Sequence, residues 1–247
     1  MKTKLKISSG LLLFLFLIVL IFLTLPKADS DNAVVIKKIE LQGNHYLSAD
    51  EYLTFTNTQK EEALRGLKII EIKDRFEKHP YVKYADVLPI GNGVLQVVLH
   101  EKNFQAILFF NDNQYLVDEN LNVAPLLPLT NNIDLPVLEN VKNLRLNRSR
   151  KSEELKKGMK ILFAAKLLDE TLLNAISEIN LNNGGDIYIT FSDDDYTLRL
   201  GRGNEVRKLA YFDALFENLK RTEQRGILQY VDLRFKDEIC LGFKSQT

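Results

Sequence analysis

The residue types that carry most enzymatic chemistry are sparse in this sequence and are not grouped. The three histidines, His45, His79 and His100, stand apart, and none belongs to the close His pairs or Cys/His clusters that bind metal ions. The sequence contains no G-x-S-x-G elbow, S-x-x-K motif or H-E-x-x-H helix, so neither a hydrolase nucleophile nor a metal-bound water is indicated. We therefore expect a non-enzymatic protein with no catalytic residues, metal or cofactor.

Two short motifs allow both a chemical and a structural interpretation. Residues 201–203, Gly-Arg-Gly, resemble a phosphate-binding loop, but Val206 replaces the third glycine, which favours a turn before a helix. The aspartates at 193–195 lack the spaced oxygen ligands of a calcium loop and predict the solvated tip of a hairpin. Neither motif is expected to bind a ligand.

The charge balance narrows the classes of partner. With 33 basic and 33 acidic residues the chain has no net charge, which argues against wholesale nucleic-acid binding. The single cysteine, Cys240, cannot form an internal disulfide and is expected to pack between its apolar neighbours. One basic loop could contact lipid headgroups or an acidic partner, although a solvated loop is the simpler interpretation; it comprises Arg145, Arg148, Arg150 and Lys151.

The N-terminus predicts a membrane anchor. Three lysines in residues 1–6 precede residues 7–25, a charge-free run dominated by Leu, Ile, Val and Phe. As a helix rising about 1.5 Å per residue, this run spans roughly the 30 Å hydrocarbon core of a bilayer. The lysines predict a cytoplasmic tail over 1–6, a transmembrane helix over 7–25 and export of the remaining chain.

A cleavable signal peptide is the alternative interpretation of the same segment. Ala28 and Ser30 imitate a processing site, but the apolar run exceeds the usual signal core of about 7–15 residues. In either case, the bulk of the protein is expected outside the cytoplasm.

After a short polar linker over 26–33, a first domain is expected over residues 34–102. The run VVIKKIEL predicts a strand, and Ser48 with Glu51 forms a capping box that begins a helix. The spacing of apolar residues predicts a second helix. This helix is expected to end before a His-Pro pair, because the residue that precedes a proline avoids the helical conformation. A tight turn over 91–93 separates two further strands. The predicted order is strand, helix, helix, strand, strand.

A second, strand-rich domain with two helices is expected over residues 103–247. QAILFF and YLVD predict its first strands, and further strands are expected near 176–181, 187–191 and 196–200. Ser152 and Asn204 are expected to cap the two helices, each with one apolar stripe. The chain closes with a predicted hairpin whose arms are 228–235 and 239–243.

Together these features resemble the FtsQ/DivIB family of bacterial cell-division proteins over almost the whole chain. IKKIELQGNHYLSADEY, FEKHPYVKYADV and VLQVVLHEKNFQAIL resemble the family's POTRA domain. YLVDENLNV, LPVL, LRLGRGNEVRKLAYFDALF and YVDLRF are similar to its C-terminal β domain. The resemblance implies an α+β protein with a single N-terminal transmembrane helix, a POTRA domain (β-α-α-β-β) and a mixed β-rich domain with two helices.

The resemblance also implies a function. It predicts a divisome scaffold at the division septum, held in the cytoplasmic (inner) membrane by one span, with its N-terminus in the cytoplasm and its bulk in the periplasm. The partners it implies are FtsB/FtsL-like bitopic coiled-coil proteins and other divisome proteins, with no nucleic acid and no small-molecule substrate. Two alternatives are an exported envelope enzyme and another POTRA-type envelope-assembly module, although the chain has no room for an outer-membrane barrel.

Partner contact is expected at the final strands, partly by β-strand addition, because a last strand often lies at a sheet edge. The resemblance places the contact at Arg234, Phe235 and Phe243, one charge and two rings of the kinds common at interfaces. The alternative for the two rings is core packing, since Phe235 shares the alternation of Leu233, and Phe243 that of Leu241.

Overall fold

The computed structural model describes residues 14, 16–18, 35–131, 133–142, 144, 152–192, 196–221, 226–236 and 238–244. Residues 14 and 16–18 are helical, and the rest of the predicted anchor over 7–25 lies outside the described residues, as do the predicted tail over 1–6 and linker over 26–33. The aspartates at 193–195 and the basic residues at 145–151 also lie outside them. Within the described ranges, no helix has the length and apolar character needed to span a bilayer.

The first sheet has three strands in the order β1-β3-β2. β1 (Lys38–Gln42) runs parallel to β3 (Val94–Glu101), and β2 (Val82–Gly91) runs antiparallel to it. Between β1 and β2 the chain forms α2 (Ala49–Thr56), α3 (Glu61–Leu64) and α4 (Ile69–Glu77). The predicted order of elements is confirmed, with the short α3 in addition.

Local sequence explains where these elements begin and end. The Ser48 hydroxyl accepts a hydrogen bond from the Glu51 N–H, and the Glu51 carboxylate accepts one from the Ser48 N–H, so the predicted capping box is confirmed. Between β2 and β3, Gly91, Asn92 and Gly93 all have positive φ, which glycine and asparagine adopt at the lowest steric cost.

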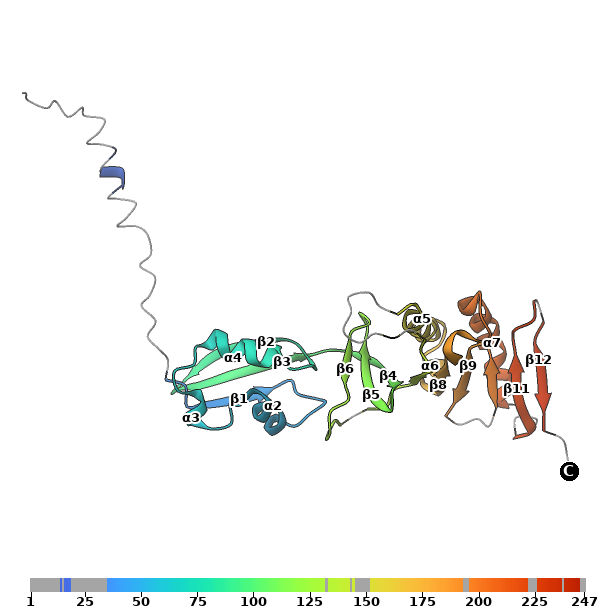
Figure 1. The fold of residues 1–247 in the computed structure, drawn as a ribbon, viewed down its shortest axis with the longest axis horizontal. Helices are drawn as coiled ribbons and strands as arrows, with labels where there is room; N and C mark the ends of the chain where they lie inside the picture. Colours follow the sequence, from blue (N-terminus) through green and yellow to red (C-terminus); the bar gives the residue numbers. More distant parts are fainter. Residues whose placement is uncertain are drawn as a thin grey trace, which may run out of the picture.

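The second sheet has nine strands in the order β12-β11-β10-β9-β8-β7-β4-β5-β6. β7 pairs in parallel with both β4 and β8, β10 pairs in parallel with β11, and the other neighbours are antiparallel. Figure 1 shows β6 beside the first sheet and β12 at the opposite end of the elongated molecule. The strands are β4 (Phe104–Phe110), β5 (Asn113–Asp118), β6 (Val123–Pro125), β7 (Val137–Glu139), β8 (Ile176–Asn180), β9 (Tyr188–Phe191), β10 (Thr197–Arg199), β11 (Leu228–Asp232) and β12 (Cys240–Phe243).

Helices cover one face of this sheet (Figure 1). They are α5 (Glu153–Leu168), which Ser152 caps as predicted, the six-residue α6 (Glu170–Ala175), which was not predicted, and α7 (Glu205–Arg221). A 3-10 turn, η1 (Asn182–Gly184), follows β8. The predicted apolar stripes of α5 and α7 are buried in one core with the sheet: Leu155, Met159, Leu162, Ala165, Leu209, Phe212, Phe216 and Leu219.

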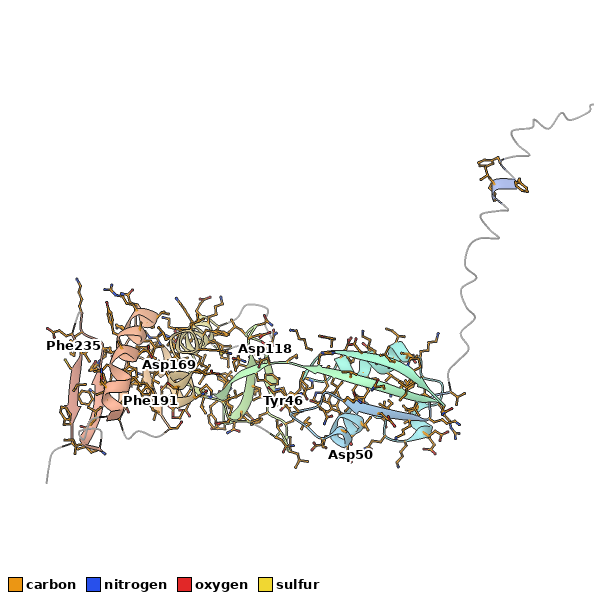
Figure 2. The ribbon with its side chains drawn as sticks, turned by 180° about the vertical axis from the view of Figure 1, so that it is seen from behind. Tyr46, Asp50, Asp118, Asp169, Phe191 and Phe235 are labelled. Atoms are coloured by element: carbon orange, nitrogen blue, oxygen red, sulfur yellow. The ribbon has the colours of Figure 1, made fainter. Side chains whose placement is uncertain are left out.

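The two sheets meet at a junction that uses residues from both. Phe104, Leu116 and Ala124 of the second sheet belong to the same buried cluster as the core of the first. The loop after β6 is fixed there, because the Leu127 N–H donates to the Tyr81 hydroxyl (2.8 Å) and the Asn131 N–H donates to the Tyr46 carbonyl oxygen (2.7 Å; Tyr46 is labelled in Figure 2). The predicted domain boundary at 102–103 falls at this junction, and the division into two domains stays a prediction.

His79 is buried beside the junction and has a structural environment. Its Nδ1 accepts a hydrogen bond from the Tyr81 N–H (3.1 Å), and its ring packs against those of Tyr52 and Phe55. Burial, and next the charge of Lys102, lower the pKa of His79 to about 4. The imidazole is therefore neutral near pH 7 and belongs to the packing of the first sheet.

Candidate protein-binding edge

The last strand, β12, lies at the free edge of the nine-stranded sheet, as expected. It pairs with β11 in a register that joins Val231 to Leu241 and Leu228 to Phe243. The Lys244 N–H donates to the Ile227 carbonyl oxygen (2.7 Å), so even-numbered residues direct their backbone groups toward β11. The N–H and C=O groups of Leu241 and Phe243 consequently point outward, where another strand can pair with them.

A row of apolar side chains accompanies these outward backbone groups. Phe235 is 53% exposed and Phe243 43%, and Ile239 and Leu241 between them are also exposed. The alternative that the two rings belong to the core is wrong, because both rings are exposed and neither lies in a buried cluster. We call Phe235, Ile239, Leu241 and Phe243 the apolar row; Figure 2 shows Phe235 at the outer end of the molecule.

One end of the apolar row borders a groove against α7. The groove has a volume of about 440 Å³, and Phe235 and Ile239 are among the residues that line it. Tyr211 and Ala214 of α7 and the buried Leu233 also line it. Three basic groups and one acidic group also border it: Arg207, Lys208, Lys236 and Glu238. The site can therefore accept an apolar side chain next to an acidic one.

The opposite face of the hairpin is stabilised by stacked side chains. The Arg199 guanidinium lies 3.6 Å from the centroid of the Tyr230 ring. The same ring covers Gly242 on β12, where an added Cβ would lie 2.7 Å from the ring's Cδ1 and closer still to Cε1 and Cζ. Gly242 thus allows the Tyr230 ring to lie flat across β12 and to hold the edge strand in place.

Arg234 has a different environment from the two rings. Its Nε and Nη2 donate to the buried Asp232 carboxylate (2.9 and 2.6 Å), and its Nη1 donates to Asp186 (3.0 Å). Hydrogen bonds from Arg234 hold the pKa of Asp232 below its ordinary value, and the two carboxylates raise the pKa of the guanidinium. Arg234 therefore ties the end of β11 to the segment before β9, and its expected contact with a partner stays a prediction.

The other side chains that could carry chemistry are bonded to residues of the chain itself. Arg202 of the Gly-Arg-Gly turn forms a bidentate pair with Glu154 of α5 (3.2 and 2.8 Å), and Lys208 donates to the Leu200 carbonyl oxygen (3.0 Å). His100 lies 3.1 Å from Asp86 and stacks on Tyr84. In the part of the chain that the structure describes, no three His, Cys, Asp or Glu side chains are placed to hold a metal ion.

The two ends of the apolar row, Phe235 and Phe243, were named as site residues from the sequence. The two residues between them and the groove were not. Ile239 and Leu241 follow the same alternation as Phe243, so the period-2 pattern of the last arm contained the signal. Tyr211 and Ala214 gave no such signal, because only the packing of α7 brings them opposite the last hairpin. The Asp186–Arg234 pair joins residues 48 positions apart and was not predictable from local sequence.

Known proteins that are similar to this chain are cell division proteins. The family model described as cell division protein FtsQ/DivIB, C-terminal, matches residues 106–234, which end just before Phe235 and β12. A cell division protein FtsQ from Geotalea daltonii is 22% identical over 208 residues, which cover 83% of this chain and 74% of that protein. A cell division protein DivIB from Solibacillus silvestris is 26% identical over 223 residues, covering 85% and 68%, respectively.

A cell division protein FtsQ from Neisseria meningitidis serogroup B is 24% identical over 219 residues, covering 87% of this chain and 85% of that protein. The family model alone covers more than half of the 247 residues and runs from within β4 to the end of β11. The chain therefore belongs to the FtsQ/DivIB family of cell division proteins.

Proposed function

We propose that this protein is a non-enzymatic scaffold of the divisome that recruits FtsB/FtsL-like bitopic proteins to the division septum. In this proposal residues 7–25 form the single span in the cytoplasmic membrane, and the cytoplasmic tail is residues 1–6. Residues 34–102 act as the POTRA domain, and residues 103–247 act as the β domain that contacts the partner. Family membership supports the cell-division role, and the order of elements around the three-stranded sheet supports the POTRA assignment.

The observation that carries the proposal is the free edge of β12 with the apolar row beside it. A partner strand would pair with the outward backbone groups of Leu241 and Phe243 and cover the exposed side chains. Because side chains alternate along a strand, every second residue of the partner would face the apolar row and the groove below α7. An apolar residue next to a glutamate or aspartate suits that groove best, since three of its four charged neighbours are basic.

A membrane anchor would add to the affinity of this site without adding a contact. If both proteins are held in one membrane, their encounter becomes two-dimensional and the effective concentration of each rises. A weak strand-addition site can then be sufficient in the cell.

Substitution at the end of the apolar row tests the proposal. We expect Phe243→Asp to abolish capture of the FtsB-like protein from the same organism, because it places a charge where a ring would be buried. The melting temperature should stay close to that of the wild type, since Phe243 is already partly exposed. Phe109→Asp is the matched control: Phe109 is 40% exposed on β4, far from β12 in the strand order, and its replacement should leave capture intact.

Capture by Phe243→Asp at wild-type affinity would remove β12 from the proposal. The cellular role is tested separately by depletion together with a fluorescent fusion. Filamentation and midcell localisation support a role in division, whereas normal division with a diffuse membrane signal argues against it.

A further inference from the structure

The end of the first sheet that lies farthest from β12 has an unusual surface. The β2–β3 hairpin tip exposes Leu88, Pro89 and Ile90, with Leu88 55% and Ile90 53% exposed. Val35, three residues before β1, is 67% exposed. We call these four residues the aliphatic tip. None of them has a packing role in the two cores.

Hydrogen bonding places Val35 next to the hairpin. The Lys37 N–H donates to the Gly93 carbonyl oxygen (2.7 Å), and an added Cβ on Gly93 would lie 2.6 Å from the Val35 carbonyl oxygen. The chain therefore begins its first sheet against the hairpin turn. The chain before residue 35 therefore enters the first sheet at the aliphatic tip.

The composition of this end suits a lipid surface. Residues 87–94 carry no charged side chain, and residues 35–38 carry Lys37 and Lys38, of which Lys38 forms an ion pair with Glu40 (2.9 Å). α3 lies at the same end in Figure 1, and its surroundings are weakly basic, with Lys60, Arg65 and Lys68 against Glu61 and Glu62. Exposed aliphatic side chains beside lysines are the combination that binds the interface of an anionic bilayer.

The backbone at the tip is poorly suited to a protein strand. Pro89 has no N–H, and the register between β2 and β3 shifts between Pro89 and Gly91, so Ile90 lies in a bulge. These two features interrupt the ladder of backbone groups that strand addition requires. The exposed Leu88 and Ile90 thus lack the backbone template that β12 has.

We propose that the aliphatic tip docks on the extracytoplasmic surface of the lipid bilayer and inserts Leu88 and Ile90 at the level of the headgroups. This inference rests on the proposed membrane anchor over 7–25. The nine residues 26–34 span at most about 30 Å even when fully extended, so the tip stays within that distance of the bilayer. Docking of the tip orients the long axis of the molecule away from the membrane and holds β12 at its far end (Figure 1).

Fluorescence quenching in vesicles tests the docking. The full chain, with Cys240→Ser and a single new cysteine, is labelled with an environment-sensitive dye and reconstituted in phosphatidylethanolamine and phosphatidylglycerol without any other protein. Dye at Ile90→Cys is expected to be quenched by lipids that carry a nitroxide near the headgroup. Dye at Phe109→Cys, an exposed apolar position of the second sheet, should not be quenched.

A second variant tests the side chains themselves. With the dye at Val35→Cys, replacement of both Leu88 and Ile90 by serine should lower the ratio of docked to undocked protein roughly tenfold. Unchanged quenching at Val35 would overturn the role of the two side chains.

Flotation of the chain with the vesicles separates the inference from the anchor on which it rests. If the chain floats with the vesicles but the dyes at positions 90 and 109 are quenched equally, the proposed anchor stands and the docking of the aliphatic tip is overturned. A chain that does not float overturns both. Quenching at Ile90 that appears only after a second membrane protein is added assigns the tip to a protein and also overturns the lipid docking.

Discussion

The close contact between the Tyr230 ring and Gly242 leaves no room for a side chain at position 242. Gly242→Ala introduces a Cβ that would lie 2.7 Å from one ring carbon of Tyr230 and closer to two others, so the ring has to move. Movement breaks its stacking with the Arg199 guanidinium, which lies 3.6 Å from the ring centroid. The edge strand then loses the side chain that covers it.

Three terms set the size of the effect. Loss of the cation–π contact costs about 0.5–1 kcal/mol, and loss of the cross-strand pair costs up to about 1 kcal/mol. Against these, replacement of a glycine restricts the unfolded chain and stabilises the fold by about 0.5 kcal/mol. We therefore expect Gly242→Ala to lower the free energy of unfolding by up to about 1.5 kcal/mol.

A double-mutant cycle isolates the mechanism. Urea unfolding of the full chain in detergent, followed by circular dichroism, is measured for Gly242→Ala with Tyr230 present and with Tyr230→Ala. Without the ring, Gly242→Ala should be neutral or slightly stabilising. Gly226→Ala is the matched control, because an added Cβ there meets no atom within 4 Å. An equal cost of Gly242→Ala in both backgrounds would refute the steric explanation.

Two further predictions concern titratable groups. Because the native pKa of His79 is about 4 and the ordinary value is 6.5, the unfolded chain binds more protons between these pH values. The free energy of unfolding should therefore rise by about 3 kcal/mol from pH 4 to pH 6.5. The His79→Gln variant, measured by urea unfolding at each pH, should lack this rise. Asp232→Asn should lower the free energy of unfolding at pH 7 by about 1–2 kcal/mol, because it weakens charge-assisted bonds to Arg234. The difference in free energy of unfolding between the wild type and Asp232→Asn should shrink as the pH falls below 3.8, the ordinary pKa of the aspartate, and then through the lower native pKa of Asp232. An equal difference at pH 7 and at low pH would contradict this prediction.

Elements with strong local signals were predictable from the sequence. The Ser48–Glu51 pair begins α2 because both of its hydrogen bonds lie within one turn, and the turn at 91–93 is marked by its glycines. The stripe on α7 follows from helical periodicity alone. In each case the partners lie within a few residues of one another, so local sequence contains the necessary information.

Features that depend on distant partners were not predictable. The parallel pairing of β7 with β4 joins strands about 30 residues apart, and nothing local distinguishes it from other pairings. Arg234 was predicted as a partner contact, and nothing in the local sequence showed that its guanidinium binds Asp186 and Asp232. Alternation alone could not decide between partner contact and core packing for Phe235 and Phe243, because their exposure depends on which distant elements cover that face of the sheet.

Amide hydrogen exchange at β12 tests the proposed partner contact most directly. In the free protein, the Lys244 N–H donates to the Ile227 carbonyl oxygen just before β11 and should exchange slowly, whereas the N–H groups of Leu241 and Phe243 should exchange fast. When the FtsB-like partner is added, strand addition predicts that the Leu241 and Phe243 amides become protected while Lys244 changes little. Saturating binding that leaves the exchange of Leu241 and Phe243 unchanged would contradict the account.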